Sequence, residues 1–261
     1  STSANITPRT LNVTYTGVNK VYDGSAMATV TTSDDRVGGD VLTINRSAAF
    51  PDKNVGTGLT VSVTGVNLTG TDSGNYNVAA TGSATANITP RVLSVTYTGV
   101  NRVYDGTGAA TVTTADDRVG GDVFTINRAA AFPDKNVGTG RTISVTGVNL
   151  TGTDGGNYSV AATGSTSADI TPAVLTIGAT GTNKVYDGNA TAGITLSDNR
   201  VTSDILTLGY GAASFPDKNV GNARTISVTG ITLTGTDSGN YTFNTTASTS
   251  ANITPRTLNV T

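Results

Sequence analysis

The sequence of 261 residues contains no cysteine, histidine, tryptophan, glutamate or glutamine, so every acidic side chain is an aspartate. Without cysteine there is no disulfide framework, no thiolate metal site and no thiol nucleophile. Without histidine, the commonest general base and metal ligand is missing as well. These absences argue against an enzyme, and we expect no catalytic residue, no cofactor and no metal site.

Charged side chains are scarce and mixed in sign, with 16 lysines and arginines against 18 aspartates. The sequence lacks the basic stripe that nucleic-acid binding requires, so we expect no nucleic-acid partner. No apolar run approaches the roughly 20 residues of a transmembrane segment, and no charged-then-apolar leader opens the chain. Glycine, threonine, serine, asparagine, valine and alanine dominate instead. All of them except alanine are poor helix formers, and threonine and valine favour strands, so the composition predicts an all-β protein.

The chain repeats itself with a period of 82 residues, and the third copy carries one inserted residue. Residues 9–90 and 91–172 differ at only 16 positions. A period this long indicates a tandem array of whole domains, because solenoid repeats run at about 20–50 residues. Three near-copies in series suit a role that depends on length or multivalency more than they suit catalysis.

The repeats predict a division of the chain into three domains with partial flanks. The expected segments are the end of a preceding repeat at 1–8, repeats at 9–90, 91–172 and 173–255, and the start of a following repeat at 256–261. The chain is thus expected to be an excerpt from a longer array. Its junctions, such as Ile88–Leu93, contain proline and no flexible Gly/Ser linker, and proline biases the preceding residue toward extended geometry. We therefore expect compact β domains joined end to end as an elongated rod, with neighbouring repeats as one another's partners.

Within one repeat, alternating apolar and polar residues predict seven or eight short strands, typical of a sandwich or a grasp-like sheet. A strand is expected from Asp40 to Asn45, and the change of alternation at Gly65 indicates a turn or a bulge. The triplet Tyr-Asp-Gly predicts a tight turn in which glycine adopts positive φ, aspartate bonds the backbone and the tyrosine ring packs on the core. The turn residues are Tyr22, Asp23, Gly24, Tyr104, Asp105, Gly106, Tyr186, Asp187 and Gly188.

Two groups of charged residues admit a chemical role. The loop acids Asp34, Asp35 and Asp40 could hold Ca²⁺, but no EF-hand or glycine-aspartate nonapeptide spacing is present, and solvated loop acids are the simpler expectation. Lys53 stands 34 residues before Asn87, which would suit an isopeptide crosslink. We expect no crosslink, because Lys53 lies in a polar turn where a solvated surface ion pair is the ordinary outcome.

An ordered set of motifs resembles the YDG repeats of large bacterial adhesins. It comprises Val21–Gly24, Gly39-Asp40, Phe50–Gly56, Gly74–Tyr76 and Ile88–Pro90, and their counterparts in the other repeats. Those repeats occur in long exported proteins, many similar to filamentous haemagglutinins, where they form stalk-like regions outside Gram-negative cells. The resemblance implies a location at the bacterial cell surface, linked to adhesion or biofilm, and it supplies no catalytic or ligand-binding residue.

Two functions remain open at this point. The first is a non-enzymatic stalk or spacer that projects adhesive domains away from the cell surface. The alternative is a set of repeats that themselves bind glycan, host protein or a neighbouring adhesin; it predicts exposed tyrosine or asparagine clusters. Self-association through sheet edges is a third possibility. The sequence identifies no glycan or protein receptor. The third repeat departs most from the pattern, at Thr202-Ser203 and around Gly209–Gly211.

Overall fold

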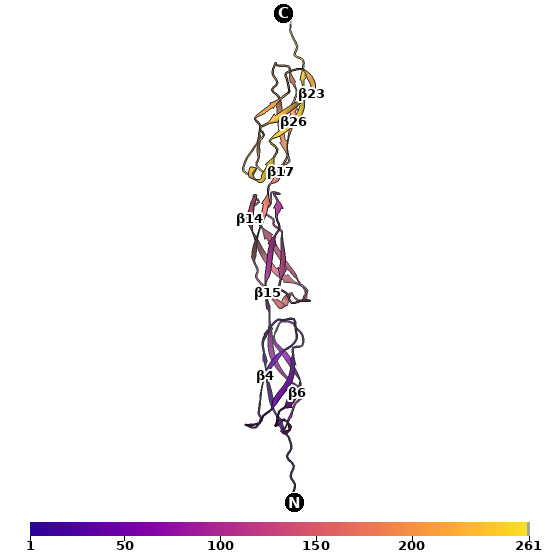
Figure 1. The fold of residues 1–261 in the computed structure, drawn as a ribbon, viewed down its shortest axis with the longest axis vertical. Helices are drawn as coiled ribbons and strands as arrows, with labels where there is room; N and C mark the ends of the chain where they lie inside the picture. Colours follow the sequence, from indigo (N-terminus) through magenta and orange to yellow (C-terminus); the bar gives the residue numbers. More distant parts are fainter. Residues whose placement is uncertain (260–261) are drawn as a thin grey trace. The chain divides into compact units, whose positions relative to one another are not determined.

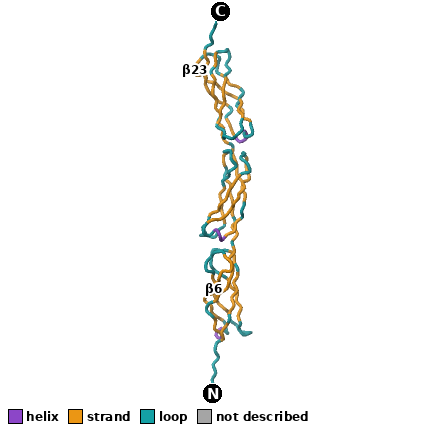
Figure 2. The backbone as a smooth tube through the Cα atoms, turned by 180° about the vertical axis from the view of Figure 1, so that it is seen from behind, coloured by secondary structure: helices purple, strands orange, loops and turns teal. Residues whose placement is uncertain are grey.

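The computed structural model describes residues 1–259, and the regular elements in them are β-strands and single 3-10 turns (Figures 1 and 2). The three tandem β domains predicted from the sequence are confirmed. Residues 1–259 contain no helix that could span a bilayer. Of the segment 256–261, expected to start a following repeat, residues 260–261 lie outside the described part of the chain.

The chain divides into two compact units, and the division passes through the second repeat. Residues 1–96, 114–129 and 146–163 form the first unit; residues 97–113, 130–145 and 164 onward form the second. Each unit therefore contains one complete flanking repeat together with the part of repeat 2 that contacts it. The predicted boundaries at 9–90, 91–172 and 173–255 stay a prediction.

Repeat 1 combines a four-stranded sheet with two strand pairs. The sheet has the order β3-β8-β6-β5, in which β3 lies parallel to β8 and the other neighbours are antiparallel. The antiparallel pair β2-β4 and the parallel pair β1-β7 complete the repeat. The elements are β1 (Arg9–Leu11), β2 (Val13–Val18), β3 (Lys20–Val21), β4 (Thr29–Asp34), β5 (Thr43–Ala49), β6 (Gly56–Thr69), the 3-10 turn η1 (Ser73–Asn75), β7 (Tyr76–Val78) and β8 (Gly82–Thr89).

The core of repeat 1 lies where β2 crosses β8. Val61, Val63 and Ile88 point inward from the sheet and are at most 1% exposed, which the alternation of apolar residues in β6 and β8 dictates. Gly17 of β2 passes so close to β8 that an added Cβ would lie 2.4 Å from the carbonyl oxygen of Thr85. Only glycine allows the two strands to approach this closely.

Repeat 2 uses the same elements in the same order. In the second unit β16 lies between β14, to which it is antiparallel, and β11, to which it is parallel; in the first unit β9 pairs with β15. The elements are β9 (Arg91–Leu93), β10 (Val95–Gly99), β11 (Arg102–Val103), β12 (Val112–Asp116), β13 (Thr125–Ala131), β14 (Gly138–Thr151), η2 (Gly155–Asn157), β15 (Tyr158–Val160) and β16 (Gly164–Thr171).

Repeat 3 differs around its inserted residue. The strand that corresponds to β5 is split into β21 and β22, and Tyr210 between them is 43% exposed. The elements are β17 (Ala173–Leu175), β18 (Ile177–Thr182), β19 (Lys184–Val185), β20 (Gly193–Asp198), β21 (Thr207–Gly209), β22 (Ala212–Ser214), β23 (Gly221–Thr229), β24 (Thr232–Thr234), η3 (Ser238–Asn240), β25 (Tyr241–Phe243) and β26 (Thr246–Thr254).

Two local expectations need correction or refinement. The strand expected from Asp40 to Asn45 begins later, because β5 starts at Thr43, and Leu42 is buried without belonging to a strand. Gly65 marks a bulge and not a turn, since β6 continues through it with a φ of 63° and its pairing with β5 shifts register at this point. The bulge explains the change of alternation that the sequence shows there.

Candidate functional site

In each unit, the buried polar and charged residues among residues 1–259 lie where one repeat contacts the next. We call the contact in the first unit the first junction and the one in the second unit the second junction. The side of the first junction that repeat 1 supplies, the lysine face, consists of Tyr22, Gly24, Lys53, Asn54 and Val55. The side that repeat 2 supplies, the aspartate face, consists of Val119, Asp122, Asp154, Asn157 and Tyr158.

The Tyr-Asp-Gly turn builds the centre of the lysine face. The backbone N–H of Tyr22 donates to the carbonyl of Thr89 at 2.9 Å, which fixes the start of the turn on the last strand of its own repeat. Asp23 then accepts hydrogen bonds from the backbone N–H and the hydroxyl of Ser25, both at 2.9 Å. Such an aspartate bond to the following backbone is the turn chemistry that the triplet predicts. Tyr22 leaves the turn with its ring buried, at 1% exposure.

The glycine of each triplet adopts the predicted positive φ, with values of 79° at Gly24, 81° at Gly106 and 88° at Gly188. Two of the three glycines also touch the next repeat. A Cβ added to Gly24 would lie 2.7 Å from Val119, and one added to Gly106 would lie 2.6 Å from Val201. Gly188 has open space around it. The glycine therefore serves both the turn and the close packing of the following repeat.

A lysine clamps the two faces of the first junction together. The ammonium of Lys53 lies 2.6 Å from a carboxylate oxygen of Asp122 and 2.8 Å from one of Asp154. Asp122 also accepts hydrogen bonds from the hydroxyls of Tyr22 at 2.8 Å and Tyr158 at 2.6 Å. Tyr158 in turn accepts from the backbone N–H of Val119 at 2.8 Å. The carboxylate at the centre is thus held from both sides of the junction.

Burial and hydrogen bonding act in opposite directions on the central carboxylate. The side chain of Asp122 is 2% exposed, and this burial alone would raise its pKa. Hydrogen bonds from Lys53, Tyr158 and Tyr22 outweigh the burial, so the pKa of Asp122 falls below its usual value. The same contacts, those to Asp122 and Asp154, raise the pKa of Lys53 above its usual value. Burial, with the bond to Asp122, raises the pKa of Tyr158 to about 12. At neutral pH the junction holds a charged lysine, charged aspartates and neutral tyrosines.

An asparagine bridge and an aromatic pair complete the first junction. The side-chain oxygen of Asn157 accepts from the backbone N–H of Val55 at 2.9 Å, and its amide nitrogen donates to the side chain of Asn54 at 3.1 Å. The rings of Tyr22 and Tyr158 meet edge to face, with centroids 5.4 Å apart. Because these interactions are directional, they fix the orientation of the two faces of the junction as well as holding them together.

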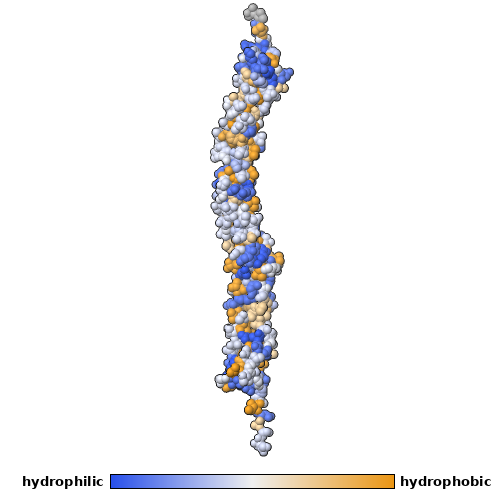
Figure 3. Space-filling view, viewed as in Figure 1, coloured by the Kyte–Doolittle hydropathy of each residue, from blue (hydrophilic) through white to orange (hydrophobic). Residues whose placement is uncertain are grey.

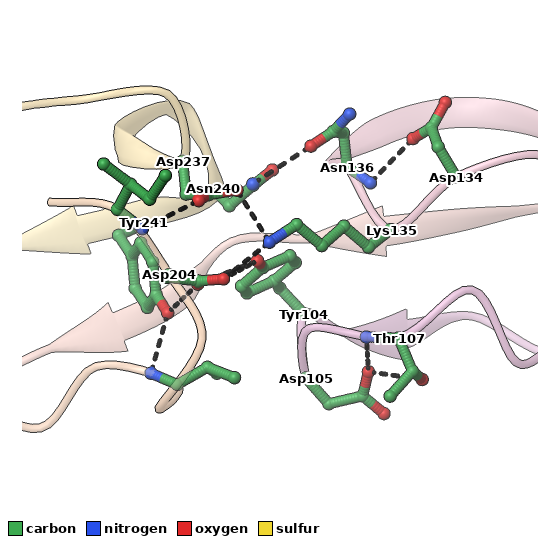
Figure 4. A network of polar contacts seen from close by, with 12 residues as sticks. Tyr104, Asp105, Thr107, Asp134, Lys135, Asn136, Asp204, Asp237, Asn240 and Tyr241 are labelled. Carbon is green, nitrogen blue, oxygen red and sulfur yellow. Dashed lines mark hydrogen bonds and ion pairs between the residues drawn. The ribbon is translucent and has the colours of Figure 1, made fainter.

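The second junction repeats the arrangement with equivalent residues (Figure 4). Lys135 extends over Tyr104 to Asp204 at 2.6 Å and to Asp237 at 2.7 Å. The equivalent bonds are those of Tyr104 and Tyr241 to Asp204, of Val137 to Asn240, of Asn240 to Asn136, and of Val201 to Tyr241. None of the 16 differences between repeats 1 and 2 falls on a position that forms the lysine or aspartate face. The same chemistry therefore recurs at both junctions.

The structure corrects two expectations about charged residues. The lysines were expected at the surface in solvated pairs, but Lys53 and Lys135 reach across to buried aspartates of the following repeat. The acid at position 40 was expected to be solvated, yet its equivalents Asp122 and Asp204 are only 7% and 6% exposed. No group of carboxylates that could hold a metal ion occurs among residues 1–259. The aspartates of each junction form ion pairs with a lysine.

The sequence predicted the Tyr-Asp-Gly turn but not the ion pair that Lys53 makes with Asp122 of the next repeat. The available signal was the strict repetition of Phe-Pro-Asp-Lys-Asn-Val-Gly at Phe50, Phe132 and Phe215 in a chain in which only 13% of residues are charged. A repeated lysine in so uncharged a sequence indicates a fixed partner.

The junction residues lie within segments that a family model matches. The model for the YDG domain matches the chain three times, at residues 7–85, 89–167 and 171–250. The chain belongs to the YDG domain family. The Tyr-Asp-Gly triplet on which our resemblance rested lies within each matched segment, and in the first two repeats it lies at a junction.

No curated protein matches the YDG chain. Among solved structures it is similar to Drosophila N-cadherin EC1-3, with 11% identity, 96% of this chain and 98% of that one covered, and a TM-score of 0.22. It is also similar to the N-terminal four Ig domains of Dscam1 isoform 6.44, with 8% identity, 95% and 73% covered, and a TM-score of 0.21. At such scores neither similarity carries a functional argument.

Proposed function

We propose that these YDG repeats are a non-enzymatic structural spacer of an exported bacterial adhesin, which projects adhesive domains away from the cell surface. The observation that supports this most is the identical chemistry of the two junctions. Each is closed by a lysine between two aspartates, at distances of 2.6–2.8 Å. At both junctions the buried aspartates are held by contacts with the neighbouring repeat. Fixed neighbour contacts are what a spacer needs in order to hold its length.

The charged groups of the junctions are poorly suited to catalysis. A general acid or base works best with a pKa near the operating pH. In the junctions the pKa of Lys53 is raised and that of Asp122 is lowered, so both move away from neutrality. On the face shown in Figure 3, apolar residues lie in small patches between polar ones. These features support a structural role.

The cellular context belongs to the same proposal. The motif set resembles repeats of exported adhesins, so we place the YDG array outside a Gram-negative cell, in a surface protein that serves adhesion or biofilm formation. Its partners are then the neighbouring repeats of its own chain. The absence of cysteine fits a domain that relies on hydrogen bonds and ion pairs, since no disulfide is available to it.

Small-angle X-ray scattering of the whole chain tests the spacer. A repeat of this size has an expected diameter of about 30 Å, so three in series should give a maximum dimension on the order of 100 Å. The double variant Lys53→Ala/Lys135→Ala should bend more easily and give a broader distance distribution. The variant Lys218→Ala, at the equivalent position of repeat 3, is the matched control. A maximum dimension near about 60 Å for the natural chain would contradict the spacer.

One observation favours a second candidate function, in which the repeats themselves bind a ligand. Asn45 donates to the side chains of Asn67 and Thr69 at 3.0 and 3.1 Å on the surface of repeat 1, and Asn127 makes the same bonds in repeat 2. An exposed asparagine cluster is the feature that a glycan-binding role predicts. Glycan-array binding that is lost on Asn45→Ala/Asn127→Ala would support it, and no binding to any glycan would remove this candidate.

A further inference from the structure

The chain enters repeat 1 at one end and leaves it at the other. The entering strand β1 begins at Arg9, which is paired with Tyr76, the equivalent of the aspartate-face residue Tyr158. The leaving strand β8 ends at Thr89, whose carbonyl accepts from the backbone N–H of Tyr22 in the lysine face at 2.9 Å. Strand β6 runs lengthwise between these two ends (Figure 1), and its 14 residues correspond to about 45 Å of extended chain. A pull on the chain at both ends of the repeat therefore acts on β1 and β8.

Tension along the chain loads the entering strand along its own axis. Because β1 and β7 are parallel and start at the same end of the repeat, a pull on the preceding chain slides β1 along β7. The hydrogen bonds between strands run across the strand direction, so sliding must break them together, whereas peeling breaks them one after another. The leaving strand β8 is loaded in the same way, but it has six residue pairs with β6 and two with β3, against three pairs between β1 and β7. The hold on β1 therefore limits the tension that the repeat withstands.

Two further anchors hold β1 in place. Leu11, its last residue, is 2% exposed, so β1 cannot slide without drawing this leucine out of the core. The carboxylate of the loop residue Asp35 accepts from the backbone N–H of Asn12 at 2.9 Å and from the side-chain amide of Asn12 at 2.8 Å. The guanidinium of Arg9 lies 3.3 Å from the same carboxylate. Asp35 thus holds β1 at its beginning and directly after its end.

The same arrangement occurs in the other two repeats. The parallel pairs β9-β15 and β17-β25 each have three residue pairs. Their buried leucines, Leu93 and Leu175, are 3% and 0% exposed. Asp117 and Asn199, the equivalents of Asp35, accept from the backbone N–H that follows the entering strand at 2.9 and 2.8 Å. Because asparagine serves in repeat 3, the feature that all three repeats share is the hydrogen bond and not the charge.

Consecutive repeats are joined without slack. Strand β8 ends at Thr89 and β9 begins at Arg91, so Pro90 alone lies between them. Strands β16 and β17 are likewise separated only by Pro172. Since proline has a fixed φ, a link of one proline has little length to give. A pull on one repeat therefore reaches the entering strand of the next repeat directly.

We propose that the repeats bear tension and that the hold on the entering strand carries the load. In repeat 1 this tension clamp consists of β1, β7 and Asp35. While the clamp holds, the strands between β1 and β8 carry no load and the repeat stays folded. The clamps of the three repeats lie in series along the chain, so the weakest one sets the tension that the array withstands. Bearing tension goes beyond the spacer role, which requires length but no resistance to pulling, and it does not depend on that role.

Single-molecule force spectroscopy of the whole chain at constant force tests the proposal. The natural chain has no cysteine, so one cysteine added at each end gives a unique pair of attachment points. The chain should lengthen in three steps, each of about 240 Å, which is the extended length of one repeat less its folded length. Asp35→Ala should shorten the lifetime of one repeat under load by about fivefold or more, because a hydrogen bond to a charged group is lost. Asp35→Asn, which introduces the residue of repeat 3, should keep the lifetime within about twofold.

A pair of core variants separates the clamp from general stability. Leu11→Ala removes the buried anchor of β1 and should shorten the lifetime under load by about tenfold or more. Ile44→Ala is the matched control, since this residue is 7% exposed and lies in β5, at the edge of the sheet opposite β3. Both variants should be less stable in urea, but Ile44→Ala should keep the lifetime under load within about twofold, because its contacts are still intact when β1 slides.

Three results would overturn the proposal. They are a natural chain that lengthens without distinct steps, an unchanged lifetime in Asp35→Ala, and equal shortening in Leu11→Ala and Ile44→Ala. Circular dichroism shows whether each variant is folded, and the exposed Asp35 decides the matter if Leu11→Ala fails to fold. The spacer is tested separately by scattering, so a clamp that fails here leaves the measured length of the chain unaffected.

Discussion

Replacing Lys53 with methionine should weaken the first junction while leaving both repeats folded. Methionine keeps the length of the side chain but removes the charge that lies 2.6 Å from Asp122 and 2.8 Å from Asp154. Breaking a buried ion pair costs about 3–5 kcal/mol when the remaining charge has no other partner. Here the lysine is 35% exposed, so water screens part of the interaction, and two tyrosine hydroxyls still donate to Asp122. We therefore expect the free energy of unfolding to fall by about 2–3 kcal/mol.

Urea unfolding of the whole chain, followed by circular dichroism, measures this loss. The array should behave as repeats coupled to their neighbours, so a weaker first junction lowers the midpoint for repeat 1 most. Lys218→Met makes the same chemical change at the equivalent position of repeat 3, where no ion pair exists within residues 1–259. This control should stay within about 0.5 kcal/mol of the natural chain. Equal losses in the two variants would refute the reasoning, because they would show that the lysine acts within its own repeat.

Three further outcomes are expected. Gly24→Ala and Gly188→Ala should each lower the free energy of unfolding by about 1 kcal/mol or more, because alanine is strained at positive φ. Gly24→Ala should lower it by about 1–3 kcal/mol more, because its Cβ would lie 2.7 Å from the next repeat. Equal losses for the two variants in urea unfolding would contradict this contact. Thermal stability should be constant between about pH 7 and 5 and fall once the pH drops below 3.8, because the folded-state pKa of Asp122 lies below that value. Asp122→Asn, although less stable, should lose less stability per pH unit in the acidic range. An unchanged pH dependence in this variant would contradict the role of Asp122. Intact-mass measurement should give the unmodified mass. A Lys53–Asn87 crosslink needs a neutral amine, whereas Asp122 and Asp154 keep Lys53 charged. A mass deficit of one ammonia or one water would contradict this prediction.

The tight turns could be predicted because they depend on neighbours in the chain. Asp23-Gly24 specifies a positive φ and an aspartate bond to the backbone two residues on, and both are present. The continuity of β6 through Gly65 was harder to predict. A glycine at a change of alternation fits either a turn or a bulge, and only the pairing of β6 with β5 selects the bulge.

The partner of the lysine could not be predicted from an array of near-copies. Lys53 could pair with Asp40 of its own repeat or with Asp122 of the next, and the residues around both aspartates are the same. The sequence separation of 69 residues to Asp122 carries no local signal. Selecting the neighbour requires the three-dimensional position of the turn, which brings Tyr22 and Lys53 to the same face. The expectation of surface lysines failed for this reason.

The junction also explains how such an array can grow. Because every repeat carries both a lysine face and an aspartate face, duplicating one repeat supplies both halves of a new junction without any new residue. The differences that accumulate between copies must then avoid the junction residues, and the 16 differences between repeats 1 and 2 do so. Changes elsewhere remain tolerable, including the inserted residue that splits β21 from β22 in repeat 3. In repeats 1 and 2 the Tyr-Asp-Gly triplet is therefore part of the surface that contacts the next repeat.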